Sequence, residues 1–349
     1  MKNSFSASAV AEALGVSINT VYRAINHSGL VKSTTQQRIL DYIREHYPEH
    51  RIGAHHTGTR TITVMTQIKP KYYWQTSIDE MRAVLEDYPS GALRLRTVFY
   101  SGVRNENALC DALSQLNART TDALIVVPVR SEKARRIIEQ LSTEIPVLIF
   151  CDYGDYGDHC LSVHGNGWQE GEEAANMVTL SSLKAKNVLI LRSMHDSNLI
   201  NDRIAGFRAR LEDCPGCSIA GELDLSDVVN GDYNYHSTLP AMIARQISDY
   251  FAANPQADIN CLYIPDGLIA PVCSAQIKLG RPDLRCFGHE FNDTVQRFFE
   301  SGIKGGSVRS DVCAQSRLAL RLLAEKLLYD QEPEEREFIT PFDSYLIEE

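Results

Sequence analysis

The sequence lacks any run of about 18 or more apolar residues, so it predicts no transmembrane helix. Its first residues, MKNSFSASAVAEALGVS, do not contain the long apolar stretch of a secretory signal peptide. Apolar residues make up 44% and charged residues 23% of the 349 positions, which is ordinary for a globular protein. These properties favour a cytoplasmic protein without a membrane partner, and the length predicts two or three domains.

Signatures of catalysis are also missing. The sequence has no G-x-S-x-G, no H-E-x-x-H and no Walker phosphate loop, and HGNGWQEG does not match G-x-G-x-x-G. Cys151, His159 and Cys160 lie close together but without a recognised metal-ligand spacing. We therefore expect no enzyme activity, no cofactor and no metal.

The nine cysteines are an odd number, and several lie in apolar runs such as CLYI and LIFC, which fits a reducing compartment. Cys214-Pro-Gly-Cys217 has the C-x-x-C spacing of redox and metal sites. It has neither a partner pair nor a thioredoxin-like start, so we interpret it as a turn between a helix and a strand.

Charge is unevenly distributed along the chain. The net charge of −10 alone argues against a nucleic-acid partner. Residues 1–60, however, carry seven Lys and Arg against four Asp and Glu, which gives +3 and leaves −13 for the remainder. Such asymmetry suggests a basic head for a polyanion and an acidic body.

Three short helices are predicted in the head. The first spans 6–14 with Ser6 as its N-cap, the second 18–26 with Ser17 as its N-cap, and the third about 34–46. The short Gly-containing turn between the first two fits a helix-turn-helix unit. The alternative is a small helical dimerisation or packing domain.

The second helix of a helix-turn-helix enters the major groove with its N-terminal residues at base edges. Asn19 can contact adenine, Arg23 guanine or phosphate, and Ile18 a thymine methyl. The residues of the head predicted to contact DNA are Ser17, Ile18, Asn19, Thr20, Tyr22, Arg23, Asn26 and Thr35. The segment 47–60 reads as a hinge or linker, in which Arg51, His55 and His56 are candidates for phosphate contacts.

From Thr61 onward, apolar strands alternate with amphipathic helices. This alternation predicts parallel sheets covered by helices on both faces. The expected strands are 62–68, 93–100, 123–129, 146–152, 187–193, 218–225, 259–266 and 284–290. They are too many for one sheet of typical size, so we expect an α/β body of two doubly wound subdomains with a ligand in the cleft between them.

The segment VAEALGVSINTVYRAINHSGLVKSTTQQRI resembles the head of lactose-repressor (LacI/GalR) family regulators, and the body resembles their periplasmic-binding-protein-like sensor. Tyr22 stands where that family usually has Ser. The resemblance implies a DNA-binding transcriptional regulator, a repressor by default, which binds operator DNA as a homodimer or higher oligomer in the cytoplasm. It divides the chain into a DNA-binding domain at 1–46, a hinge at 47–60 and an effector-binding and dimerisation domain at 61–349.

The resemblance also implies residues of the effector cleft. The segment HDSNLINDRIAGFRARL is similar to the family's S-x(5)-R-x-x-G-F pattern, which places Arg203 in the cleft. LYIPDGLIA is similar to its N-D-x-x-A segment, which makes Asp266 an acceptor for ligand hydroxyls. Asn166 and Glu290 stand beside the first and second crossovers between the subdomains.

Four more candidates come from their places along the chain. Trp74 and Tyr73 follow the first strand of the body, Trp168 follows the first crossover, and Arg130 ends a strand. Aromatic faces at such positions can stack on sugar rings, although an aromatic side chain in a loop is often only packing.

These residues do not decide the chemical class of the effector. Asp266 with Glu290 would favour a sugar or sugar derivative, whereas Arg203 with Arg130 would favour a phosphorylated metabolite, and a purine is a further alternative. A solute-binding protein without DNA function is the remaining rival. We predict an N-subdomain of about 61–163 with 292–310 and a C-subdomain of about 164–291 with 311–349.

Overall fold

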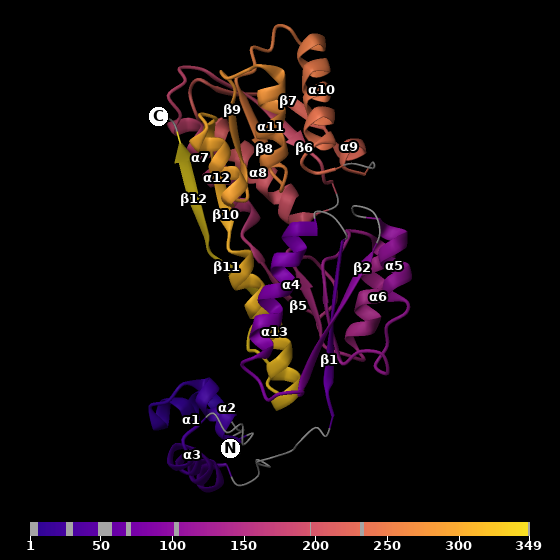
Figure 1. Cartoon of the computed structure of the whole chain (residues 1–349), viewed down its shortest axis with the longest axis vertical. Coiled ribbons are helices and arrows are strands. Elements are labelled where there is room, and N and C mark those ends of the chain that lie inside the picture. The colour runs from indigo at the N-terminus through magenta and orange to yellow at the C-terminus, as the bar shows by residue number, and fades with distance from the viewer. Residues whose placement is uncertain are drawn as a thin grey trace.

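A computed structural model describes residues 6–25, 31–47, 58–67, 71–100, 105–195, 197–230 and 234–347, with the backbone alone for 71–73. In Figure 1 a group of three helices lies at the lower end of two stacked α/β lobes. The lobe nearer these helices is here called the first lobe, and the other the second lobe. No helix in the described part of the chain is both long and apolar enough to cross a membrane.

The three-helix head consists of α1 (Ala7–Leu14), α2 (Ile18–Ile25) and α3 (Ser33–His46), each close to its predicted bounds. The Ser6 side chain caps α1 by accepting from the backbone N–H of Ala9. The Ser17 hydroxyl accepts from the backbone N–H of Thr20 at 3.1 Å at the start of α2. The core of the head is formed by Ala7, Val10, Ala11, Val21, Tyr22, Ala24, Ile25, Ile39, Leu40 and Ile43.

The first lobe is built on a six-stranded parallel sheet in the order β11-β5-β4-β3-β1-β2. Its strands are β1 (Arg60–Gln67), β2 (Leu93–Tyr100), β3 (Ala123–Val126), β4 (Val147–Phe150), β5 (Leu161–Gly165) and β11 (Glu337–Thr340). Helices α4 (Lys71–Leu85) and α13 (Val312–Tyr329) cover one face, and α5 (Glu106–Leu113) and α6 (Glu132–Ser142) cover the other. Alternating side chains of each strand therefore face two separate cores.

The second lobe has the same plan, with the strand order β12-β10-β9-β8-β6-β7. Its strands are β6 (Lys186–Arg192), β7 (Cys217–Asp224), β8 (Cys261–Ile264), β9 (Arg285–His289), β10 (Lys304–Ser310) and β12 (Phe342–Ile347), of which only β12 is antiparallel to its neighbour. One face carries α9 (Ser226–Asn230), α10 (Thr238–Ala253), α11 (Ile269–Leu279) and α12 (Asp293–Glu300), and the other carries α7 (Gly167–Leu180) and α8 (Asn198–Glu212). The predicted α/β body of two parallel-sheet lobes is confirmed.

The chain crosses between the lobes at 165–167, 310–312 and 340–342. The structure differs from the predicted subdomain limits after residue 291. It places 292–310 in the second lobe, because β10 pairs in parallel with β9, and it places α13 in the first lobe, because Leu320 and Leu323 are buried in that lobe's core. The C-terminal segment is divided, since β11 extends the first sheet and β12 the second.

The C-x-x-C segment is a turn, as its Pro-Gly centre predicts. The backbone N–H of Cys217 donates to the carbonyl of Cys214 at 3.1 Å, and Gly216 has a φ of 79°. Both cysteines are free thiols, and burial raises the pKa of the Cys217 thiol above its usual value. The thiol is therefore less reactive than an ordinary cysteine.

Candidate functional site

A chamber of about 130 Å³ lies between the lobes, at the carboxyl ends of the strands of both sheets. Residues directly at or after strand ends form much of its wall, which is where parallel sheets bind ligands. The residues that line this inner chamber include Gln67, Trp74, Val127, Cys151, Asp152, Ser193, Leu199, Ile200, Arg203, Tyr235, Asp266, Gly267, Glu290 and Ser310.

Arg203 in α8 lies against this wall, and its charge is balanced by a buried carboxylate. Its Nε and Nη2 contact Oε2 of Glu170 in α7 at 2.7 and 2.6 Å, and the Glu170 side chain is fully buried. Nη1 also donates to the carbonyl of Pro265 at 2.9 Å. The Ser310 hydroxyl donates to the other Glu170 oxygen at 2.6 Å and accepts from Nη2 of Arg203 at 3.3 Å. The guanidinium is thus fixed in position and paired.

Asp266, two residues beyond β8, is buried at the base of the chamber. One carboxylate oxygen accepts from the backbone N–H of Leu268 at 3.1 Å, and the other accepts from the backbone N–H and the hydroxyl of Ser193. Burial raises the pKa of this carboxyl above its usual value, against the opposing effect of these hydrogen bonds and of Arg203. The carboxyl is therefore held in a single orientation at the chamber wall.

Asp152 follows β4 of the first lobe and contacts the second lobe. Its Oδ1 accepts from the backbone N–H groups of Asn198 at 3.1 Å and Leu199 at 3.2 Å, at the N-terminus of α8. Carboxylates are favoured at helix N-termini, where backbone N–H groups lack partners within the helix. Asp152 therefore links the two lobes at the edge of the chamber.

Glu290 and Cys151 on the chamber wall have φ angles of 75° and 56°, in the left-handed region that non-glycine residues rarely adopt. The Glu290 carboxylate lies directly over the backbone of Gly267, where a Cβ would come within 2.3 Å of its Oε1. Strained backbone of this kind is concentrated at ligand sites, so both residues mark the chamber as a candidate functional site.

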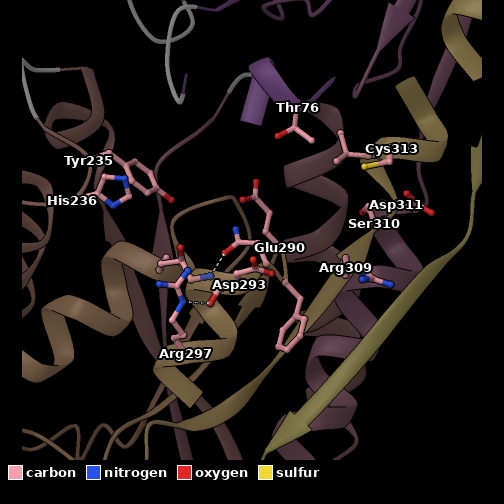
Figure 2. A pocket seen from close by; sticks show the side chains of 15 residues that line it. Thr76, Tyr235, His236, Glu290, Asp293, Arg297, Arg309, Ser310, Asp311 and Cys313 are labelled. Atoms are coloured by element: carbon pink, nitrogen blue, oxygen red, sulfur yellow. Dashed lines mark hydrogen bonds between the residues drawn. The ribbon is translucent and has the colours of Figure 1, made fainter. Parts of the chain in front are cut away.

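A second and larger chamber of about 740 Å³ adjoins the first and shares Tyr235, Glu290 and Ser310 with it. Figure 2 shows Glu290 in the middle of this outer chamber, with Thr76 of the first lobe and Tyr235 of the second lobe around it. The Tyr235 hydroxyl donates to the carbonyl of Gly267 at 3.0 Å. The two chambers form one continuous cleft between the lobes.

Four of the predicted cleft residues line the inner chamber: Trp74, Arg203, Asp266 and Glu290. The other predicted residues with a described side chain lie elsewhere. Asn166 caps α7 by accepting from the backbone N–H of Gln169, and Trp168 is 44% exposed. Arg130 lines a separate surface pocket.

Tyr73 lies in α4, but its side chain is outside the described part of the structure. Further wall residues were not predicted, among them Gln67, Ser193 and Tyr235. Gln67 ends β1 and Ser193 directly follows β6, so their places at strand ends were a usable signal. Tyr235 lies in a loop before α10 and carries no such signal.

The residues predicted to contact DNA divide into three groups. Ser17, Ile18 and Asn19 are exposed at the start of α2, and Thr20 and Thr35 are partly exposed. Asn26, Arg51, His55 and His56 lie outside the described residues.

Tyr22 and Arg23 form the third group, because both lie against the first lobe, which buries Tyr22 and partly covers Arg23. Tyr22 is 4% exposed and stacks on Tyr329. Nη2 of Arg23 lies 3.8 Å from a carboxylate oxygen of Asp87. In this arrangement the Tyr22 ring is not accessible to DNA, because the side of α2 that carries it packs against the first lobe.

Several solved structures are similar to this chain. A carbohydrate transporter solute-binding protein from Agrobacterium radiobacter, in complex with D-arabinose, is 16% identical with a TM-score of 0.69, covering 83% of this chain and 95% of that one. A protein from Bacteroides fragilis, provisionally assigned as a LacI transcriptional regulator, is 17% identical with a TM-score of 0.69, covering 82% and 97%. A solute-binding protein from Bacillus halodurans with bound myo-inositol is 16% identical with a TM-score of 0.66, covering 83% and 95%.

At these identities the likeness shows the fold alone. No curated protein matches the chain by sequence. The family model of the periplasmic binding protein domain matches residues 62–331, which span nearly all of the two lobes. The chain therefore belongs to the periplasmic binding protein domain family.

Proposed function

We propose that the cleft between the lobes binds an uncharged polyhydroxylated ligand, a sugar or a cyclic polyol. The observation that carries this proposal is the convergence of carboxyl groups from both lobes on one chamber, namely Asp152 from the first lobe and Asp266 and Glu290 from the second. Carboxylates accept hydrogen bonds from hydroxyl groups, and Trp74 supplies an apolar ring for the C–H face of a sugar.

The charges of the cleft argue against a phosphorylated ligand. Among the described residues that line the inner chamber, Arg203 is the only basic side chain, and Glu170 neutralises it. A phosphate group in the inner chamber would lie beside three carboxyl groups without an uncompensated cation, and like charges repel strongly in a buried site. The basic side chains Arg297 and Arg309 line the outer chamber instead. Arg130, the other cation expected to favour an anion, lines a different pocket.

The solved structures support the same ligand class. Those with bound D-arabinose and myo-inositol share the two-lobed fold over more than four fifths of this chain. Their ligands are neutral and rich in hydroxyl groups, in keeping with the chemistry of this cleft.

A thermal-shift screen of the whole chain against neutral pentoses, hexoses and inositols tests the proposal. A ligand at about 100 times its Kd adds about 2.7 kcal/mol to stability, which raises Tm by about 5 to 10 °C. Glu290→Gln removes a charge from the wall and should weaken the shift. Glu300→Gln, at the exposed end of α12, is the matched control and should not. The absence of a shift with every sugar would contradict the proposal.

We further propose that ligand binding regulates DNA binding by the head, with the chain acting as a homodimer on a palindromic operator. The observation that favours this role is the first turn of α2, where Ser17 caps the helix and Ile18 and Asn19 are exposed together. A capped helix with polar and apolar side chains at its exposed N-terminal end is suited to the major groove. The basic excess of residues 1–60 supports the same role.

Fluorescence anisotropy with DNA selected from a random pool tests the second proposal. Asn19→Ala should lower the affinity by about 5- to 100-fold, as expected for the loss of one base contact. Gln37→Ala, on the exposed side of α3, is the control and should leave the affinity unchanged. Failure to select any DNA would favour the remaining candidate, a solute-binding protein without a DNA function, for which the sugar-bound transport proteins of the same fold are the precedent.

A further inference from the structure

The head is held against the first lobe by a stack of two tyrosines. The rings of Tyr22 in α2 and Tyr329 at the end of α13 lie 4.3 Å apart with an interplanar angle of 11°, which is an offset-stacked pair. Tyr88, just after α4, lies 6.5 Å from Tyr329 on the lobe side. Tyr329 also packs against the core of the head, so it belongs to the interface as much as to its own helix.

Charged side chains surround this stack. Arg23 of α2 lies 3.8 Å from Asp87, which also pairs with Arg321 of α13 at 3.0 Å. Glu325, one turn before Tyr329, is largely buried at the same place, and burial raises the pKa of its carboxyl. Burial also raises the pKa of the Tyr22 hydroxyl, with a smaller contribution from Glu325. The interface therefore has a buried centre at Tyr22, with Glu325 partly buried beside it and the Arg23–Asp87 pair about one third exposed at its edge.

Two helices join this contact to the cleft. Helix α13 begins with Val312 and Cys313 in the outer chamber and ends at Tyr329, a length of about 27 Å. Helix α4 has Trp74 in the inner chamber and is followed by Asp87 and Tyr88 at the contact with the head. Figure 1 shows α4 and α13 side by side, with the lower end of α13 facing the head.

Ion pairs tie the two helices together along their length. Arg317 contacts Glu80 at 2.6 Å, and Arg321 contacts Asp87 at 3.0 Å. The apolar residues between them, including Leu320 and Met81, lie in one buried core. The pair therefore behaves as one rigid unit with one end at the cleft and the other at the head.

We propose that the end of this helix pair is a docking surface for the chain's own three-helix head, and that it holds α2 with Tyr22 buried and Arg23 partly covered. Here Tyr22 is an anchor for docking, not a base-reading residue. Both helices belong to the first lobe, and α13 begins directly after a crossover to the second lobe, so a shift of this helix pair within the first lobe on ligand binding would also move the docking surface. The docking itself is independent of the proposed regulatory function. Only the further step, in which undocking frees the head to bind DNA, rests on that function.

Small-angle X-ray scattering of the whole chain tests the docking directly. Tyr329→Ala removes the ring that Tyr22 stacks on, so the radius of gyration and the maximum dimension should both increase. Tyr329→Phe keeps the stack and should remain as compact as the unmodified chain. Tyr345→Ala is the matched control, since Tyr345 lies in β12 and stacks on Phe291 in the second lobe, which does not carry the head contact. Unchanged dimensions in Tyr329→Ala, with a native circular dichroism spectrum, would overturn the docking proposal.

The same variants separate docking from DNA binding. If both proposals hold, Tyr329→Ala raises DNA affinity by about 2- to 12-fold, the factor expected for loss of one stacked aromatic pair. An expanded Tyr329→Ala chain that binds no DNA would retain the docking surface and refute the regulatory function. A Tyr329→Ala chain that stays compact and binds DNA as tightly as the unmodified protein would refute the docking surface and leave DNA binding by the head in place.

Trp74 reports on the connection to the cleft without any ligand. The chain has two tryptophans, and Trp168→Phe removes the exposed one, leaving Trp74 as the sole tryptophan. In that background, Tyr329→Ala should change the quenching of Trp74 by acrylamide, because coupling between two sites is reciprocal. Superimposable quenching curves would show that the helix pair does not connect the head to the cleft.

Discussion

Arg203 and Glu170 form a buried ion pair at the back of the cleft, with two guanidinium nitrogens within 2.7 Å of one carboxylate oxygen. The pair positions Arg203 and also cancels its charge. A cation that sequence reasoning assigns to ligand recognition thus has a carboxylate partner inside the protein, so the remaining carboxyl groups set the charge that a ligand meets.

Replacement of Glu170 tests this pair. Glu170→Gln leaves the Arg203 charge buried without its partner, which should lower the free energy of unfolding by about 3–5 kcal/mol. Glu222→Gln is the control, because Glu222 pairs with Arg192 and Arg208 in a partly exposed setting, where each salt bridge contributes about 1 kcal/mol or less. Chemical denaturation measures the loss of unfolding free energy in each of the two variants. Equal losses would mean that the Arg203–Glu170 pair is no different from a surface pair.

Helices α7 and α8 approach so closely that glycine is required at their crossing. A Cβ on Gly171 would lie 2.0 Å from the backbone oxygen of Arg203, and neither backbone can yield without separating the helices. Gly171→Ala should therefore lower the free energy of unfolding by about 1–3 kcal/mol, although alanine is the better helix former. Glu172→Ala, one position along, should be nearly neutral. A stabilised Gly171→Ala variant would contradict the close packing.

Replacement of Gly267, unlike that of Gly171, should affect ligand binding rather than stability. A Cβ there would meet only the end of the flexible Glu290 side chain, at 2.3 Å from its Oε1. Gly267→Ala should leave Tm nearly unchanged but push the Glu290 carboxylate out of place and weaken ligand binding by about 10-fold, the worth of one hydrogen bond to a charged group. Calorimetric titration with a sugar found in the screen measures the loss. Unchanged affinity would exclude Glu290 from the binding wall.

His289 makes stability depend on pH. Its ring is fully buried, its Nε2 lies 3.0 Å from the Tyr263 hydroxyl, and burial, with a smaller effect of Arg203, lowers its pKa well below the usual value. The unfolded chain therefore takes up a proton near pH 6.5 while the folded chain does not, so stability falls as pH drops below 6.5. Between pH 6.5 and 5 the loss should reach about 1.6 kcal/mol, because half of the unfolded imidazoles are already protonated at pH 6.5.

Urea unfolding at these two pH values measures the effect. His289→Gln should show a smaller difference between them than the unmodified chain. Asp266 works in the opposite sense, because its raised pKa favours the folded state at acid pH, so its contribution cannot produce the loss. An equal pH dependence in both chains would remove His289 as the cause.

Much of the fold follows from the sequence, because the eight predicted strands are short apolar runs between amphipathic helices. Four strands were not predicted, namely β5, β10, β11 and β12, and their patterns are weaker. β10 reads KGGSVRS, and its Gly305 has a φ of 144° against the carbonyl of Cys286, a geometry that periodicity does not encode. β11 and β12 are separated only by Pro341, so their assignment to different lobes depends on tertiary pairing.

The site was predictable where a residue stands at a strand end. Arg203 and Asp266 line the chamber as expected, but the partner of Arg203 was not foreseen, because Glu170 is 33 positions away and meets it only through the crossing of α7 and α8. Trp168 was placed in the cleft from its nearness to the crossover, yet it lies on the outer side of α7, where helix phase directs it to solvent. Tyr22 was given a base-reading role from its place in α2, whereas Tyr329, which covers it, is some 300 residues distant in sequence.

Isothermal titration calorimetry with matched pairs of ligands tests the central claim most directly. Each neutral pentose, hexose or inositol is compared with its own phosphate monoester on the whole chain. The charge of the cleft predicts saturable binding of at least one neutral compound, at one site per chain, and no measurable binding of its phosphate ester. Tighter binding of the phosphate ester than of its parent, or no saturable heat from any neutral compound, would contradict the account.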